Sequence, residues 1–267
     1  MNYKILLPNR LLSDLVQCFW TLESIPGEVP PREYFLMADN CLEFIFQYGG
    51  GFQTYAAQST RIRFQHSTFD KFRVGSAIGF FGVRLYPHAV SQILGMPAGE
   101  GVNGVTGFSE FFRQPGEDLS DRIYNASNVT ERVGLISEFL STGAWLDKKV
   151  DPVSRFVHQL IASDGQMDIS RMWQVSGLSI KQFERRFKAI AGFPPKYFAR
   201  ICRFQGARKR YHASREESLT GLAYSCNYYD QSHFNREFKE FSGVKPLQYF
   251  KRVDYGGETR LPCGWFV

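Results

Sequence analysis

The chain has 267 residues, of which 43% are hydrophobic and 22% are charged, an ordinary composition for a soluble globular protein. This length is enough for two modest domains, each with its own core. No apolar run is long enough to span a bilayer, and residues 1–8 lack the architecture of a signal peptide, so neither a membrane protein nor a secreted protein is expected.

The net charge of +6 is unevenly distributed along the chain. Residues 1–150 contain 13 Lys and Arg against 15 Asp and Glu, whereas residues 151–267 contain 19 against 11. A basic C-terminal part favours a polyanion as its partner, although a solvated basic surface would have the same composition.

The cysteines are scattered, and none belongs to a CxxC pair: Cys18, Cys41, Cys202, Cys226 and Cys263. This pattern indicates reduced thiols in the cytoplasm rather than a disulfide framework. The five histidines show no metal-ligand spacing, so no metal and no cofactor are expected.

Up to about residue 86 the sequence is typical of strands. Residues 43–48 are rich in aromatic and β-branched residues and precede three glycines at 49–51, which predict a turn. Residues 61–65 alternate, and residues 78–86 form a third strand-like run that Pro87 ends. We expect a small antiparallel sheet or partial barrel.

From residue 88 the pattern becomes helical. Short helices are expected at 88–94, 109–112 and 118–124, and a longer one at 129–140. A polar stretch at 147–152 indicates a domain boundary, after which Asp151 is expected to cap a helix that has Pro152 at its first position and ends near Ser163.

The chain repeats itself after residue 165. Six identical pairs stand 51 residues apart: Phe183/Phe234, Arg185/Arg236, Phe187/Phe238, Lys188/Lys239, Gly192/Gly243 and Pro195/Pro246. Six identities at one constant offset indicate an internal duplication.

Each copy predicts a helix-turn-helix. The first helix covers residues 169–175 in one copy and 219–225 in the other. A turn follows at Gly177 or Asn227, residues that tolerate unusual backbone angles, and Ser179 or Asp230 then caps the second helix.

The second helix of each copy is expected to bury two phenylalanines at i and i+4 and to expose a polar face. Such side chains suit the edges of bases in the major groove of double-stranded DNA. The candidate DNA-binding residues are Lys181, Glu184, Arg185 and Lys188 in the first copy and Gln231, Ser232, Asn235, Arg236 and Lys239 in the second.

Residues 195–211 predict one long helix between the copies. A stiff connector would hold the two recognition helices about one turn of DNA apart, roughly 34 Å. Its basic residues are expected to face outward, where they either pair with local acids or contact phosphate. The candidates for phosphate contacts are Arg200, Arg203 and Arg208.

At these residues the chain resembles the AraC/XylS family of transcription regulators. The resemblance covers about residues 155–253 and is most specific at 228–239, followed by Gly243, Pro246 and Tyr249, whereas Trp173 stands where the family usually has a small alanine. It implies base contacts by Lys181, Glu184, Arg185, Gln231, Ser232, Asn235 and Arg236. More weakly, residues 15–20, 43–48 and 81–87 are similar to an N-terminal domain found ahead of such units, which implies sensing or dimerisation.

The expected architecture is an α+β N-terminal domain, a small sheet or partial barrel plus helices, followed by an all-α domain with two helix-turn-helix units joined by a long helix. The expected bounds are 1–147 and 151–253, with the units at about 166–192 and 217–243 and a C-terminal tail at 254–267. Besides DNA, the candidate partners are an unidentified small-molecule effector, RNA polymerase and a second copy of the chain.

An enzyme is not expected, because no GxSxG, HExxH or P-loop pattern occurs. Two alternatives stay open. A DNA-repair regulator would need a methyl-accepting cysteine, for which Cys18 and Cys41 are the candidates. A protein-interaction module would use the same helices without sequence-specific DNA contact. In the N-terminal part, Glu43 and Arg84 are expected either to face a pocket or to pair with each other.

Overall fold

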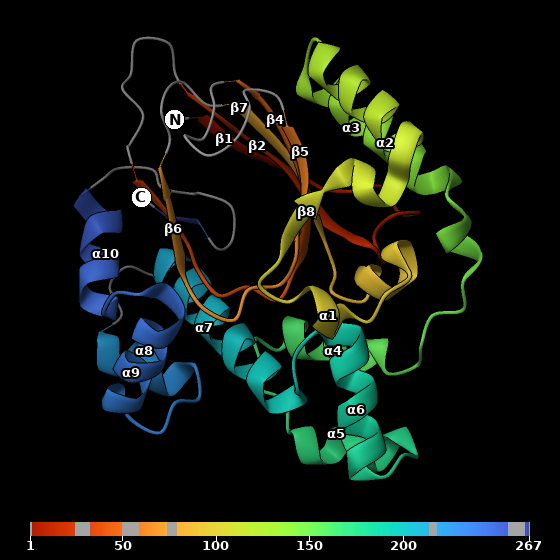
Figure 1. The fold of residues 1–267 in the computed structure, drawn as a ribbon. Coiled ribbons are helices and arrows are strands. Elements are labelled where there is room, and N and C mark those ends of the chain that lie inside the picture. The colour runs from red at the N-terminus through yellow and green to blue at the C-terminus, as the bar shows by residue number, and fades with distance from the viewer. Residues whose placement is uncertain are drawn as a thin grey trace.

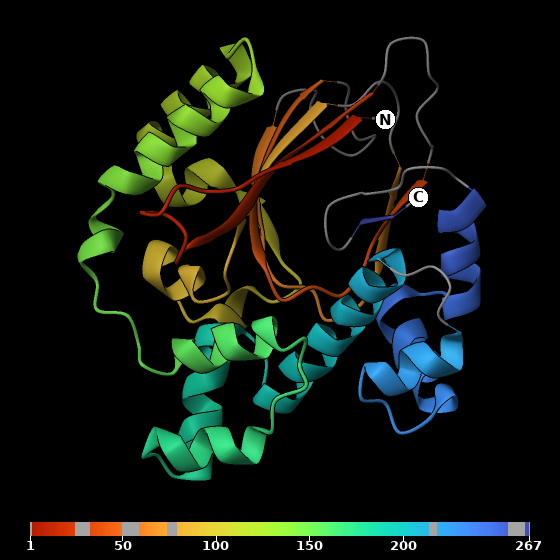
Figure 2. The same ribbon diagram turned by 180° about the vertical axis from the view of Figure 1, so that it is seen from behind.

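The computed structural model describes residues 2–24, 33–49, 59–73, 79–213, 218–255 and 265–266. An antiparallel sheet with helices comes first, and a helical region follows below and beside it (Figures 1 and 2). The predicted fold class is confirmed.

The described strands form two antiparallel sheets. The larger sheet has the order β1-β2-β7-β4-β5-β8 and the smaller has the order β6-β3-β9. Their bounds are β1 Asn2–Leu6, β2 Val16–Glu23, β3 Glu33–Leu36, β4 Leu42–Gly49, β5 Ser59–Arg63, β6 Asp70–Arg73, β7 Gly79–Leu85, β8 Val105–Gly107 and β9 Trp265–Phe266.

One face of the larger sheet is the apolar core of the N-terminal part. Because side chains alternate along a strand, Phe44 and Phe46 of β4 join this core with Val83 of β7, whereas Glu43 belongs to the opposite face. Helices α2 (Phe108–Asn125) and α3 (Val129–Thr142) lie beside the sheet, and the Phe108 ring meets that of Phe44 edge-on at 5.1 Å.

Helix α2 combines the two short helices that were expected at 109–112 and 118–124. They run into one another through Arg113, whose φ of 48° is not helical, two residues before Pro115. Smaller elements in this part are η1 (Val90–Leu94), a π-helix, together with α1 (Ala98–Gly101) and η2 (Ala144–Asp147). The element η1 corresponds to the helix expected at 88–94 and begins two residues later, at Val90.

The helical region contains α4 Ser154–Ala162, α5 Ile169–Ser176, α6 Ile180–Ala191, α7 Pro195–Ala213, α8 Leu219–Ser225, α9 Gln231–Ser242 and α10 Pro246–Tyr255. Helix α4 begins at Ser154, two residues later than expected, and residues 152–153 form a turn. Asp151 caps this turn, since it accepts a hydrogen bond from the backbone N of Val153 at 2.9 Å. Helix α7 lies between α4–α6 on one side and α8–α10 on the other (Figures 1 and 2).

A second apolar core is formed by residues of all the helices from α4 to α10. Two residues of the N-terminal part, Met37 and Ala38, are fully buried in it.

Near the C-terminus, Trp265 and Phe266 pair with β3, so the end of the predicted tail docks on the smaller sheet. Residues 256–264 and 267, and residues 50–51 of the expected glycine turn, lie outside the described residues. Within the described ranges, no helix is both long and apolar enough to cross a membrane.

Candidate nucleic-acid interface

The first helix-turn-helix unit has the local geometry that its sequence predicts. Gly177 ends α5 in the left-handed conformation with φ of 71°, where a Cβ would be strained. Ser179 then caps α6, since its Oγ accepts from the backbone N of Gln182 while the Gln182 side chain returns to the backbone N of Ser179. The chain therefore turns sharply between α5 and α6.

The second unit repeats this geometry with different residues. Asn227 takes the left-handed conformation with φ of 59°, and the Asp230 side chain accepts from the backbone N of His233 at 2.6 Å, which caps α9. Helix α8 begins at a Ser218 cap, whose Oγ accepts from Gly221. Both predicted turns and both predicted N-caps are confirmed.

The phenylalanine pairs hold the two recognition helices α6 and α9 on the core. Phe183, Phe187, Phe234 and Phe238 are all 0% exposed. Phe187 meets Phe198 of α7 edge-on at 5.5 Å, and Phe238 meets Phe204 of α7 at 5.0 Å. The connecting helix therefore contacts both recognition helices through aromatic rings, which fixes each of them against it.

The candidate DNA-binding side chains lie on the opposite faces of these helices. Seven of them are exposed and two are half-buried, Gln231 and Asn235; the exposed ones are Lys181, Glu184, Arg185, Lys188, Ser232, Arg236 and Lys239. The structure thus brings the predicted residues together on one outer face of α6 and one of α9. Lys188 lies beside the N-terminal part, since a Cβ at Gly99 of α1 would be 3.8 Å from its Cε.

The three phosphate-contact candidates on α7 do not lie as expected. Arg208 is 6% exposed, and its guanidinium donates to the hydroxyl of Tyr249, at 3.0 Å, and to Gln205 Oε1, at 2.7 Å. The expectation that Arg208 faces outward is wrong: these neutral acceptors and the surrounding aromatic rings hold it inside the fold.

Arg200 and Arg203 pair with acids, which was the alternative expected for the arginines of this helix. Arg200 Nε donates to Glu237 Oε2 at 2.7 Å, and its Nη2 donates to Glu240 Oε2 at 2.6 Å. Arg203 Nη2 lies 4.0 Å from Glu237 Oε1, and its guanidinium stacks over the Tyr228 ring. Because Glu237 is buried in α9, these ion pairs join α7 to the second recognition helix rather than facing a duplex.

The N-terminal part contacts the connecting helix α7 through hydrogen bonds between side chains and backbone carbonyls. Asn40 Nδ2 donates to the carbonyl of Phe198 at 3.1 Å, and the hydroxyl of Tyr197 donates to the carbonyl of Ser67 at 2.9 Å. At the other end of the molecule, α1 packs against α6, where Gly99 approaches the carbonyl of Gly192.

A buried ion cluster lies on the polar face of the larger sheet. Arg84 Nη1 donates to Glu43 Oε1 at 2.9 Å and its Nη2 donates to Asp39, while Arg63 donates to the other oxygen of Glu43. All four side chains are at most 6% exposed. Glu43 and Arg84 pair with each other, and Arg84 also lines a small pocket, so both roles considered for Arg84 are met. Asp39 and Arg63 complete the cluster.

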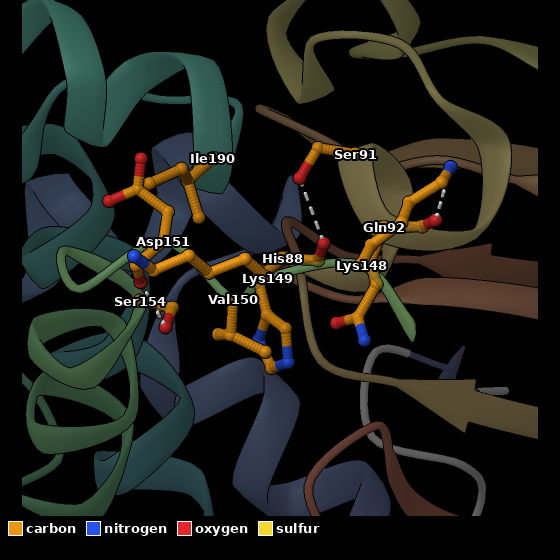
Figure 3. A pocket seen from close by; sticks show the side chains of 9 residues that line it. All are labelled: His88, Ser91, Gln92, Lys148, Lys149, Val150, Asp151, Ser154 and Ile190. Carbon is orange, nitrogen blue, oxygen red and sulfur yellow. Dashed lines mark hydrogen bonds between the residues drawn. The ribbon is translucent and has the colours of Figure 1, made fainter. Parts of the chain in front are cut away.

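A pocket of about 200 Å³ lies where the segment 148–151 crosses from the N-terminal part to the first unit. Ile190, Asp151 and Ser154 lie on one side of it, and Ser91 and Gln92 on the other (Figure 3). It is lined by His88, Ser91, Gln92, Lys148, Lys149, Val150, Asp151, Ser154 and Ile190. Burial, and then the neighbouring His158, lowers the pKa of His88 to about 4, so its ring is neutral at pH 7.

The cysteine candidates for methyl transfer lie in the N-terminal part. Cys41 is 4% exposed and its Sγ accepts a hydrogen bond from Gln17 Nε2 at 3.1 Å, whereas Cys18 is half-buried. No group of three or more His, Cys, Asp and Glu side chains that could hold a metal occurs in the part of the chain that the structure describes.

Comparison with known proteins gives two family matches. Residues 173–252 match a model described as a helix-turn-helix domain, and residues 4–107 match a domain of unknown function, DUF6597. No curated protein matches the chain.

Solved structures of ToxT from Vibrio cholerae are similar to this chain, and the one with the higher TM-score shares its fold. One is 12% identical, with a TM-score of 0.51, over 87% of this chain and 98% of that one. Another, from Vibrio cholerae O395, is 11% identical, with a TM-score of 0.49, over 88% and 98%. A third, bound to (E)-4-(8-methylnaphthalen-1-yl)but-3-enoic acid, is 10% identical, with a TM-score of 0.48, over 94% and 99%.

The matched residues 173–252 contain α6, α7, α8 and α9 and hence both recognition helices. The chain therefore contains a helix-turn-helix domain at residues 173–252, behind an N-terminal stretch at residues 4–107 that matches DUF6597.

Proposed function

We propose that the protein is a sequence-specific transcription regulator that places α6 and α9 in successive segments of the major groove on one face of a DNA duplex. One observation carries this proposal. Each helix buries its phenylalanine pair completely and exposes an arginine at the same position of the repeat, Arg185 in α6 and Arg236 in α9. A guanidinium there is suited to guanine, the commonest specific contact in a major groove.

The length of the connector supports the same arrangement. Helix α7 has 19 residues and is therefore about 28 Å long at about 1.5 Å per residue. A rigid spacer of this size suits two recognition elements that are about one helical turn of DNA apart. One copy of the chain would then contact two sub-sites without a second copy.

Selection of bound DNA from a random pool tests this function. The full chain should enrich one sequence with two sub-sites about 10 base pairs apart, and affinity for it should fall steeply with salt while the preference persists. A pool that shows no enrichment after repeated rounds would contradict the proposal and favour the protein-interaction alternative.

We further propose that an effector acts through the N-terminal domain. The support is the pocket at the crossing segment, which joins η1 of the N-terminal part to Ile190 near the end of α6. A ligand in this pocket would contact Ile190 in the last turn of α6, the first recognition helix. A small molecule that raises the unfolding temperature of the chain should then also change its DNA affinity, and one that stabilises without changing affinity would contradict this role.

The remaining partners stay predictions. Contact with RNA polymerase and dimer formation would be measured on the protein bound to its selected DNA. A cytoplasmic location is part of the same proposal, because that DNA lies in the cytoplasm. For the repair alternative, intact mass after incubation with methylated DNA is the test: we expect no methyl adduct on Cys18 or Cys41, since Cys41 is buried against Gln17.

A further inference from the structure

The pocket at the crossing segment is lined by both parts of the molecule. His88, Ser91 and Gln92 come from the N-terminal part, whereas Ser154 and Ile190 come from helices α4 and α6 (Figure 3). Its volume of about 200 Å³ is below the range of about 300–1,000 Å³ that is usual for drug-sized ligands. An occupant of this pocket would therefore be a small molecule with a short carbon chain.

Two lysines give the pocket an excess of positive charge. Lys148 Nζ donates to the backbone carbonyl of Gln92 at 2.9 Å, which is a neutral partner, and Lys149 is exposed and forms no ion pair with the residues that the structure describes. The acid in the lining, Asp151, already accepts from Arg186 Nε at 2.6 Å. The charge that remains for a ligand is positive, so an anion is favoured.

One hydrogen-bond acceptor in the lining is buried and unused. His88 is 4% exposed, and its Nδ1 has no hydrogen-bond partner among the described residues. The ring is hydrogen-bonded to the backbone of Asp14, and because Nδ1 takes no part in this bond, the donor is Nε2. In the neutral ring Nδ1 therefore carries a lone pair, and a buried acceptor without a partner is unfavourable. A ligand that donates to Nδ1 would remove this cost.

Two serine hydroxyls in the lining have the same preference. Ser91 Oγ donates to the carbonyl of His88 at 3.0 Å, and Ser154 Oγ donates to the carbonyl of Asp151 at 2.7 Å (Figure 3). Because each hydroxyl proton is used in this way, the two oxygens offer lone pairs to a ligand. Together with His88 Nδ1, they favour a ligand that has hydroxyl groups as donors.

We infer, on the basis of the effector role proposed above, that the pocket binds a small hydroxylated anion. Its carboxylate or phosphate group pairs with Lys149, and its hydroxyl groups donate to His88 Nδ1 and to the serine oxygens. Such a ligand connects the N-terminal part with the crossing segment and α4. Hydroxy acids and phosphate esters of short polyols share this chemistry, so one of each is tested.

Four small molecules separate charge from hydroxyl groups: glycerate, glycerol 3-phosphate, glycerol and propionate. The first two have both features, glycerol has only hydroxyl groups, and propionate has only the charge. In calorimetric titrations of the full chain at fixed salt, glycerate, glycerol 3-phosphate or both should bind at least about tenfold more tightly than glycerol and propionate, because each missing charged or hydrogen-bonded contact costs about a factor of ten. Equal affinity for glycerate and propionate, or no binding of either hydroxylated anion, overturns the inference.

Lys149→Gln removes the ammonium group and should weaken binding of the hydroxylated anion about tenfold. Lys4→Gln is the matched control, since Lys4 is exposed on β1 and does not line the pocket. This variant removes the same charge from the protein and should bind the anion as wild type does. Equal weakening in the two variants would show that the anion responds only to net charge, and would overturn the site.

His88→Leu removes the buried acceptor. It should weaken glycerate binding about tenfold and leave propionate binding unchanged, because propionate has no hydroxyl group to donate. Ser91→Ala tests the same recognition at a half-buried position where the fold is less exposed to damage, and should also weaken glycerate selectively. Variants that lose glycerate and propionate equally, or neither, would overturn the role of these acceptors.

DNA titration in the presence of the bound anion separates this inference from the effector role. An anion that binds in the pocket and leaves the affinity for the selected DNA unchanged would contradict the effector role and keep the site. Failure of both hydroxylated anions to bind would overturn the ligand class and leave sequence-specific DNA binding untouched.

Discussion

The backbone N–H of Ala38 donates to the carbonyl of Phe241 at 2.9 Å, and this bond attaches the end of β3 to the last turn of the second recognition helix. The carbonyl of Ala38 in turn accepts from Gln205 Nε2 of α7 at 2.6 Å. One residue of the N-terminal part therefore contacts both the connector and α9, so the position of α9 depends on it.

Ala38→Leu should disturb this attachment. Ala38 is 0% exposed in the helical core, and three further carbon atoms there would overpack it, which lowers the free energy of unfolding by about 1–3 kcal/mol. DNA affinity should fall as well, because α9 is displaced. Urea unfolding and DNA titration measure the two effects. Ala144→Leu, at an exposed position, is the control and should change neither.

Arg236→Ala should weaken DNA binding without weakening the fold. Its side chain is exposed on α9, so the free energy of unfolding should stay within about 0.5 kcal/mol of wild type. Binding to the selected site should lose about 1–3 kcal/mol, and the preference at one base position should relax. Wild-type affinity in this variant would show that α9 does not contact bases through Arg236.

Arg208→Ala should have the opposite effect. Removal of this buried guanidinium leaves Gln205 and the Tyr249 hydroxyl without their donor, and we expect a loss of about 2–3 kcal/mol in stability. The slope of log affinity against log salt should not change, whereas removal of a phosphate contact would reduce it by about 1. A stable variant with a reduced slope would restore the phosphate role of Arg208.

Glu43→Gln should be strongly destabilising. Arg63 and Arg84 would lose the negative charge of the Glu43 carboxylate in a buried site, and breaking a buried ion pair costs about 3–5 kcal/mol. Glu138→Gln breaks a pair with Arg122 in which both side chains are more than half exposed, and should cost less than about 1 kcal/mol. Equal losses in the two variants, measured by urea unfolding, would contradict the role of the cluster.

Acid should weaken the fold in part through His88. Its pKa is about 4 in the folded protein and about 6.5 in the unfolded chain, so only the unfolded chain binds this proton between those values. The free energy of unfolding therefore falls as the pH drops from about 6.5 to 4, by about 3 kcal/mol from this group. His88→Asn should lose that part of the pH dependence. A stability difference between variant and wild type that is constant from pH 7 to pH 4.5 would be inconsistent with this assignment.

The helix-turn-helix geometry was predictable because its determinants are local. Gly177 and Asn227 adopt positive φ, and Ser179 and Asp230 cap helices through bonds that span only three residues, so the local sequence encodes this geometry. The buried phenylalanines follow from helical spacing for the same reason.

The arginines of α7 could not be placed in this way. Arg200 and Glu237 are 37 residues apart, and whether a helical arginine faces solvent or an acid depends on which helix packs beside it. Asp39 and Arg63 were missed for a similar reason, since their cluster forms only when strands from separate parts of the chain meet at the polar face of the sheet.

The unbroken α-helical backbone of α7 also constrains how a binding site could change during evolution. One residue inserted in the middle of the helix would rotate the second unit by about 100° relative to the first. A base pair added between the two sub-sites would turn them by a different angle, so neither change compensates for the other in a single step. The spacing within each operator of this regulator should therefore be invariant, with sequence variation confined to the bases themselves.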